Sequence, residues 1–257
     1  LLRTFLALAA GLVFAQAQPA NREALWKQVA AAEKKGLPKT AAAKLQLIYD
    51  SALRDGRHAE AIKALAKRIT HEGAVQGNKP EEKITRLQAE LEKTPDEAKP
   101  LLQTILGHWY WQYFRANRYR FLQRTATAQP LGEDFTTWDL PRLYHEIDLH
   151  FTNALADGRL KTIPTTDFAD LLTKPTLPEK YRPTLYDFIA HEALGFYTSG
   201  EFAAAKPEDA FEVQAGDPLL GPLDKFLAWQ PQTTDTESPK IKAIRLFQDV
   251  LRFHLDD

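Results

Sequence analysis

The chain has 257 residues, with 33 Lys or Arg and 34 Asp or Glu, so its formal net charge is −1. The chain has no excess of basic residues, so its composition gives no support for nucleic-acid binding. It also has no acidic tail of the kind that forms a disordered, solvating segment. The absence of Cys excludes disulfides, Cys nucleophiles and thiolate metal sites. Such a chain must be held together by its hydrophobic core.

Residues 1–17, LLRTFLALAAGLVFAQA, have the pattern of a secretory signal peptide. Arg3 precedes an apolar run from Phe5 to Phe14, and the run ends in Ala15-Gln16-Ala17, a small-x-small cleavage pattern. We expect cleavage after Ala17 and a periplasmic or secreted protein. The run is too short to span a bilayer comfortably, so we expect no membrane span after its removal. The alternatives are a buried N-terminal helix or a retained anchor.

Helical periodicity with short polar turns predicts paired helices over residues 18–94. Asn21 is a candidate N-cap for a first helix that ends at Gly36-Leu37-Pro38, and Thr40 is a candidate N-cap for a second. A third helix is expected over 58–71. The second helix is expected to turn inward Ala43, Leu47, Ile48 and Leu53.

The junction between the second and third helices, SALRDGRHAEAIKAL (51–65), resembles a tetratricopeptide helix junction. Only about two such units are visible. Gly73 to Pro80 is then expected to be a loop, and Pro80 to begin a helix that ends near Lys93.

Residues 95–257 are also mostly helical in pattern. We expect a long helix over 97–125, a helix after Trp138 and Asp139, a helix starting at Pro183, partial helix within 219–229 and a final helix over 241–255. Pro- and Gly-rich connections separate them. No segment shows sustained alternation of apolar and polar residues with period two, the pattern of a β-strand. We therefore predict an all-α domain over 18–257. It would consist of stacked antiparallel helices, with a possible subdivision into 18–94 and 95–257.

An aromatic cluster in the helix over 97–125 is the strongest local feature. Consecutive rings cover more than one helix face, and interleaved arginines could stack on them. One interpretation is a binding groove for a peptide or glycan. The other, which we favour, is a central helix buried between two layers, because aromatic side chains mostly supply buried area. The candidate partner surface consists of Trp109, Trp111, Arg115, Arg118 and Tyr119.

Metal and cofactor sites are not expected. His191-Glu192 begins like a zinc-protease helix, but Gly195 stands where the second His is needed. His145, Glu146, Asp148 and His150 offer ligand types, but the two histidines are five positions apart and point to different faces. We expect His108 and His191 to be hydrogen-bonded near the core.

Catalytic residues are not evident either, so we expect no enzyme. The chain lacks a Gly-rich phosphate loop and a Gly-x-Ser-x-Gly elbow. Paired carboxylates could serve a helical glycan hydrolase, but Asp and Glu are spread along amphipathic helices, where a solvated face is the usual explanation.

Three stretches resemble, in wording and order, the N-terminal helical region of bacterial alpha-2-macroglobulin-family proteins. They are ALWKQVAAAEKKGLPKTAAAKLQLIYDSALRDG (24–56), HWYWQYFRANRYRFLQRT (108–125) followed by TTWDL (136–140), and EKYRPTLYDFIAHEALGFYTS (179–199). In that family such a region follows the signal peptide and precedes β-sandwich macroglobulin domains, which carry a bait segment and in many members a Cys-Gly-Glu-Gln thioester. Family members are thought to trap proteases.

The resemblance implies a non-catalytic scaffold module of an exported protease inhibitor. Its partner would be the downstream macroglobulin domains or an envelope protein. Since the chain has no Cys, it cannot perform thioester trapping by itself, and we expect it to be a piece of a longer protein. The alternatives are a free-standing helical-repeat binding protein of the envelope for peptide or protein partners, and the helical hydrolase.

Overall fold

The computed structural model describes residues 21–77, 79–123, 132–168, 181–201, 210–235 and 237–255. Over these residues the chain is all-α, as predicted, with α-helices and short 3₁₀ turns and no β-strand. The expected signal peptide and its cleavage site at Ala17 lie outside the described residues. Among the described helices, none combines the length and the apolar character needed to cross a bilayer.

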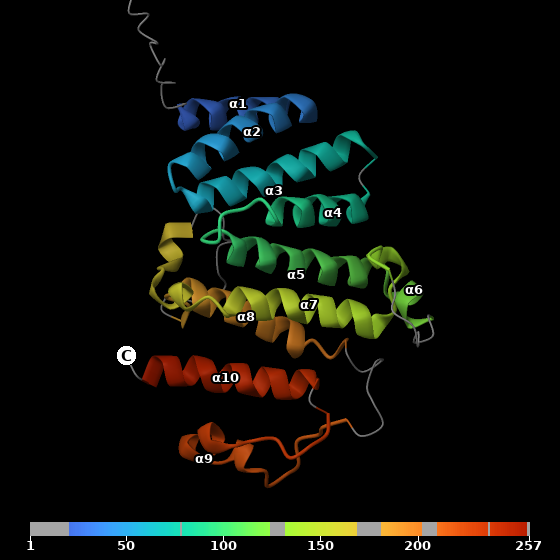
Figure 1. Cartoon of the computed structure of the whole chain (residues 1–257), viewed down its shortest axis with the longest axis vertical. Helices are drawn as coiled ribbons and strands as arrows, with labels where there is room; N and C mark the ends of the chain where they lie inside the picture. Colours follow the sequence, from blue (N-terminus) through green and yellow to red (C-terminus); the bar gives the residue numbers. More distant parts are fainter. Residues whose placement is uncertain are drawn as a thin grey trace, which may run out of the picture.

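The helices stack one after another along the long axis of the molecule, with α1 at one end and α9 at the other (Figure 1). Most contacts join neighbouring layers, such as α1 with α2, α2 with α3, α4 with α5, α5 with α7 and α8 with α10. The α-helices are α1 (Arg22–Lys34), α2 (Pro38–Arg54), α3 (His58–Val75), α4 (Pro80–Leu91), α5 (Lys99–Ala116), α6 (Arg118–Leu122), α7 (Leu140–Leu155), α8 (Leu185–Tyr197), α9 (Leu223–Ala228) and α10 (Pro239–Leu255).

The ends of α1 and α2 confirm one predicted cap and correct another. Asn21 caps α1, since its Oδ1 accepts a hydrogen bond from the Ala24 amide at 3.1 Å. Thr40 is not the N-cap of α2, which begins at Pro38 with Leu37 in the capping position. Proline is well suited to the first turn because it has no amide hydrogen to leave unpaired there, so the helix starts three residues earlier than expected.

The inward face of α2 differs from the prediction. Ile48 is buried as expected, but Leu47 is half exposed and Ala43 is exposed. The helix instead buries Ala41, Leu45, Ile48, Tyr49 and Ala52. At about 100° per residue, Ala43 and Leu47 lie on the side of α2 opposite this buried stripe. Beyond α2, α3 continues to Val75, so it takes up residues that were expected to form a loop.

The long helix expected over 97–125 is wrong, because it is two helices, α5 and α6, that meet at Asn117. The Asn117 backbone leaves the helical region (φ −115°, ψ 18°), and its side-chain amide donates to the Tyr113 carbonyl at 2.9 Å. Asn competes with the backbone for hydrogen bonds in this way and often interrupts helices. Residues 124 and 125 lie outside the described part.

The starts of α7 and α8 are fixed by acidic and hydroxyl side chains. Asp139 caps α7, accepting from the Arg142 amide at 3.0 Å. The expected start at Pro183 is early by two residues, because Thr184 caps α8 in a capping box with Asp187. A single antiparallel bridge pairs Pro164 with Thr184 and holds this N-terminus.

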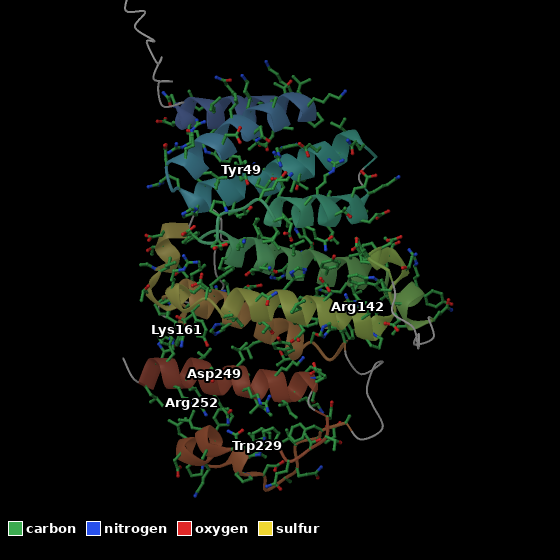
Figure 2. All side chains as sticks on the ribbon, viewed as in Figure 1. Tyr49, Arg142, Lys161, Trp229, Asp249 and Arg252 are labelled. Atoms are coloured by element: carbon green, nitrogen blue, oxygen red, sulfur yellow. The ribbon has the colours of Figure 1, made fainter. Side chains whose placement is uncertain are left out.

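One cluster of buried apolar side chains runs through the stack from Val29 of α1 to Leu246 of α10. A smaller cluster at the far end is formed by Leu219, Trp229 and Ile241. Trp229 follows α9 on the side facing α10 (Figure 2), and Gln248 of α10 donates to the Trp229 carbonyl at 3.0 Å. The tetratricopeptide-like character of 51–65 stays a prediction, although Gly56 makes the α2–α3 turn with φ +66°.

Candidate interaction surfaces

The aromatic residues of α5 divide between core and surface. Tyr110, Tyr113 and Phe114 are buried. The rings of Tyr110 and Tyr113 each meet Phe135 edge to face, with centroids 5.1 Å apart. For these three residues the interpretation as a central buried helix is confirmed, and their rings join α5 to the residues that precede α7.

Trp111 is half buried and contacts Phe196 of α8 and Glu201, which follows α8. Its ring meets Phe196 edge to face at 5.5 Å, and its indole nitrogen donates to Glu201. The Arg115 guanidinium lies 5.9 Å from the Trp111 ring, and its Nε is 3.5 Å from Glu201 Oε1. Arginine stacking on the aromatic helix, with a carboxylate at its edge, is therefore observed at this position.

The candidate partner residues are divided between two helices, α5 and α6. At about 100° per residue, Trp109 lies about 160° around α5 from Trp111, on the other flank of the helix. Arg118 and Tyr119 belong to the separate helix α6, where both are exposed, Tyr119 to 75%. Because of the break at Asn117, these sequence neighbours do not belong to one continuous helix.

The predicted polar contacts of two histidines are confirmed. The His108 imidazole pairs with Glu192, which joins α5 to α8. His191 Nδ1 lies 2.7 Å from the Asp187 carbonyl, one turn earlier in α8. Both imidazole rings therefore make hydrogen bonds within the fold.

Two buried polar atoms lie at the α5–α7 interface without a hydrogen-bond partner among the described residues. They are the Tyr110 hydroxyl and His150 Nε2. His150 is buried, its Nδ1 contacts Gln103, and its ring stacks on Tyr110 with centroids 5.5 Å apart. Because burial disfavours the charged imidazolium, the pKa of His150 falls to about 4. Burial likewise raises the pKa of Tyr110.

The four ligand-type residues of α7 separate into two flanks. Glu146 and His150 face the α5 side, where Glu146 also lies 3.6 Å from Arg142. The Arg142 guanidinium covers the Trp138 ring at 4.9 Å, toward the α6 end of α7 (Figure 2). His145 and Asp148 face the other way, toward α10.

His145 and Asp148 lie beside Glu237, from the segment that precedes α10. Their potential ligand atoms all lie within 4.8 Å of one another. The Lys242 ammonium lies 2.8 Å from Asp148 and 2.6 Å from Glu237. Sequence analysis identified His145 and Asp148 as ligand types but missed Glu237, because nothing local in the sequence indicates that this segment returns to α7.

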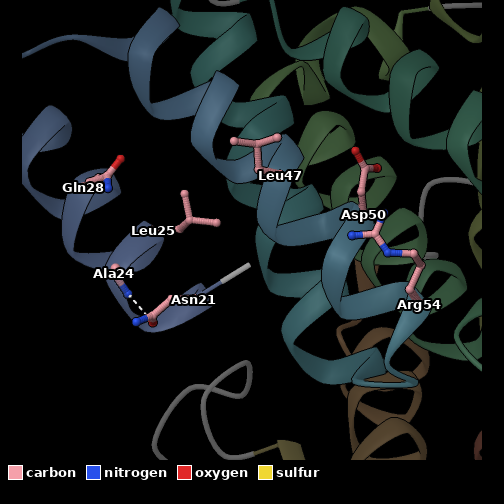
Figure 3. Close-up of a pocket in the computed structure, with 7 residues that line it drawn as sticks. All are labelled: Asn21, Ala24, Leu25, Gln28, Leu47, Asp50 and Arg54. Atoms are coloured by element: carbon pink, nitrogen blue, oxygen red, sulfur yellow. Dashed lines mark hydrogen bonds between the residues drawn. The ribbon is translucent and has the colours of Figure 1, made fainter. Parts of the chain in front are cut away.

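An open groove of about 400 Å³ lies between α1 and α2. Figure 3 shows side chains of both helices along it, with Leu25 and Leu47 facing each other across the gap. The groove was missed because Leu47 was expected in the core; in fact it is 50% exposed. Its lining residues are Asn21, Ala24, Leu25, Gln28, Leu47, Asp50 and Arg54.

The groove has an apolar centre and a polar rim. Ala24, Leu25 and Leu47 supply the centre. Asp50 is oriented by Gln46, whose amide donates to it at 2.7 Å. Protein interfaces share this arrangement of apolar core and polar edge. In chemical terms the groove can hold a few apolar side chains of a partner and offer hydrogen bonds and charges around them.

Comparisons of the chain with protein-family models, with curated proteins and with solved structures found no match.

Proposed function

We propose that this chain is a non-catalytic scaffold module that binds another protein domain through the groove between α1 and α2. Specifically, it would be the N-terminal helical region of an exported alpha-2-macroglobulin-like protease inhibitor. Support comes from the three stretches that resemble that region, and from an all-helical stack in the part of the chain where they occur. The location is periplasmic or extracellular if residues 1–17 act as a signal peptide.

The groove is the observation that carries the proposal. In stacked-helix proteins each layer covers the apolar face of its neighbour, and the terminal layers carry a polar outer face. Here the pair α1 and α2 at the end of the stack leaves Leu47 half exposed, and Leu47 faces Leu25 across the open groove. An exposed apolar centre at the end of a stack is the position where a further domain can continue the packing. The occupant we propose is a macroglobulin-type β-sandwich domain of the same protein.

The alternative is a free-standing helical-repeat protein that binds a peptide in the same groove. It is favoured by the two helical ridges that line the groove, from residues 21, 24, 25 and 28 on α1 and residues 47, 50 and 54 on α2. An amphipathic peptide helix could lay its apolar side between such ridges.

The reading frame beyond residue 257 distinguishes the two proposals. We expect it to encode β-rich domains, and a separately expressed first domain to bind the chain in isothermal titration calorimetry. A stop codon directly after residue 257 would contradict the inhibitor assignment and leave the peptide-binding alternative. A β-rich region that does not bind the chain would contradict the proposed docking.

A further inference from the structure

A mixed cluster of histidine and carboxylate side chains lies between α7 and the segment that precedes α10, several layers away from the groove (Figure 1). His145 and Asp148 are three residues apart on α7, so they share one helix flank. Glu237 approaches them from the segment that precedes α10. The cluster thus brings one imidazole and two carboxylates, from two separate segments, within reach of a single ion.

The charges of this cluster do not balance. Asp148 and Glu237 share one cation, the Lys242 ammonium, at 2.8 and 2.6 Å. Asp148, Glu237 and Lys242 together carry one excess negative charge. The position between the two carboxylates already holds a cation, and a divalent ion in place of the ammonium would neutralise the group completely.

A hydrogen bond from α8 also orients the Asp148 carboxylate. The Tyr197 hydroxyl of α8 donates to Asp148 Oδ1 at 2.6 Å, while Lys242 contacts the other oxygen, Oδ2. Hydrogen bonds of this kind to a ligating carboxylate orient it and support metal binding. Asp148 Oδ2 is therefore the oxygen that points toward the cation position.

We propose that His145, Asp148 and Glu237 form a site for a first-row divalent metal ion such as Zn²⁺, which replaces the Lys242 ammonium. One imidazole, two carboxylates and a water complete the four ligands that Zn²⁺ commonly takes. At metal–ligand bonds of about 2.1 Å in a tetrahedron, ligand atoms lie about 3.4 Å apart. The cluster therefore has to contract from its present spacing.

The contraction requires movement mainly of side chains that are exposed to solvent or long enough to turn toward it. The Glu237 side chain is 74% exposed, and His145 is exposed. Lys242 is long and 22% exposed, so its ammonium can turn to solvent while its stem stays on α10. Asp148, which Tyr197 holds in place, needs to move least. This inference is independent of the proposed docking function.

Titration of the whole chain with Zn²⁺ in a calorimeter tests the site. We expect one ion per chain with a dissociation constant in the micromolar range. His145→Ala and Glu237→Gln should each weaken binding at least tenfold, since each removes one of three ligands. His71→Ala is the matched control, because it removes a histidine paired with a single carboxylate, Glu33 at 2.9 Å. It should leave Zn²⁺ binding unchanged.

Lys242→Met separates the proposal from simple surface binding. Removing the competing ammonium should tighten Zn²⁺ binding about tenfold, with circular dichroism confirming that the variant is folded. If that variant does not fold, the Glu237→Gln comparison decides, since its exposed side chain is not needed for packing. No binding at one equivalent, or equal loss in the His145 and His71 variants, would overturn the site. A folded Lys242→Met variant that binds more weakly would overturn the replacement of the ammonium.

Discussion

Gly107 of α5 lies directly against the Phe151 ring of α7. A β-carbon built on Gly107 would lie 3.2 Å from Cε2 and Cζ of that ring. Phe151 is fully buried, and its ring also meets Phe196 of α8 at 5.9 Å. The missing side chain therefore allows close approach at the place where α5, α7 and α8 come together.

Two glycine substitutions should have opposite effects on stability. Gly107→Ala gains about 1 kcal/mol of helix propensity but crowds a buried ring, at a cost of about 1–3 kcal/mol. We expect a net loss of about 1 kcal/mol. Gly195→Ala in α8 meets nothing within 4 Å and should gain about 0.5–1 kcal/mol. Urea unfolding of the two variants measures both. A stabilised Gly107→Ala would contradict the close packing.

Asp187 should be one of the most sensitive polar positions. Its side chain is fully buried, closes the capping box with Thr184, and accepts from His254 of α10 at 2.7 Å through Oδ1. Asp187→Ala loses the reciprocal half of the capping box and removes the carboxylate that accepts from the Thr184 amide and from His254, so we expect a loss of about 3 kcal/mol. His254→Ala, at a side chain 35% exposed, should cost about 1 kcal/mol. Equal losses in thermal unfolding would show that the cap contributes little.

His150 should make stability fall in mild acid. The folded-state pKa of His150 is about 4, below the ordinary value of 6.5. Between these two pH values the unfolded chain binds a proton at His150 and the folded chain does not. The contribution of neutral His150 to the free energy of unfolding is therefore complete above about pH 6.5 and declines as the pH falls toward 4. The expected loss between pH 7 and pH 5 is about 2 kcal/mol. His150→Gln, which can keep a bond to Gln103, should remove this part of the decline in urea titrations at the two pH values. An unchanged slope would argue that His150 is protonated in the fold.

Two aromatic candidates should separate structural from surface roles. Trp111→Ala removes a ring packed on Phe196 and a donor to Glu201, and we expect a loss of about 2 kcal/mol. Tyr119→Ala removes a side chain that is 75% exposed, so its effect should stay within about 0.5 kcal/mol. Thermal unfolding checks both. A large loss for Tyr119→Ala would place that ring in the core after all.

Local signals in the sequence were sufficient for the fold class and for several helix ends. Asn21 caps its helix as predicted, because an N-cap depends on a side chain and the next three residues. Leu47 was misplaced because only the neighbouring helices decide which side of α2 is buried. The break at Asn117 depends on one side-chain bond to the Tyr113 carbonyl.

The candidate sites were harder to predict than the helices. Trp109 and Tyr119 are close in sequence, but helix rotation and the break at Asn117 separate them. Glu237 reaches His145 and Asp148 only because α10 packs against α8, which brings the segment before α10 to α7. The groove between α1 and α2 likewise depends on how two helices pack, which periodicity within either helix does not reveal.

A matched pair of leucine variants tests the central claim that the α1–α2 groove binds a protein domain. Leu47 and Leu37 are exposed to 50% and 46%, but only Leu47 lines the groove. Calorimetry should measure the affinity of each variant for the first domain encoded after residue 257. We predict that Leu47→Glu weakens binding at least tenfold and that Leu37→Glu leaves it unchanged. Equal effects of the two substitutions would contradict the account.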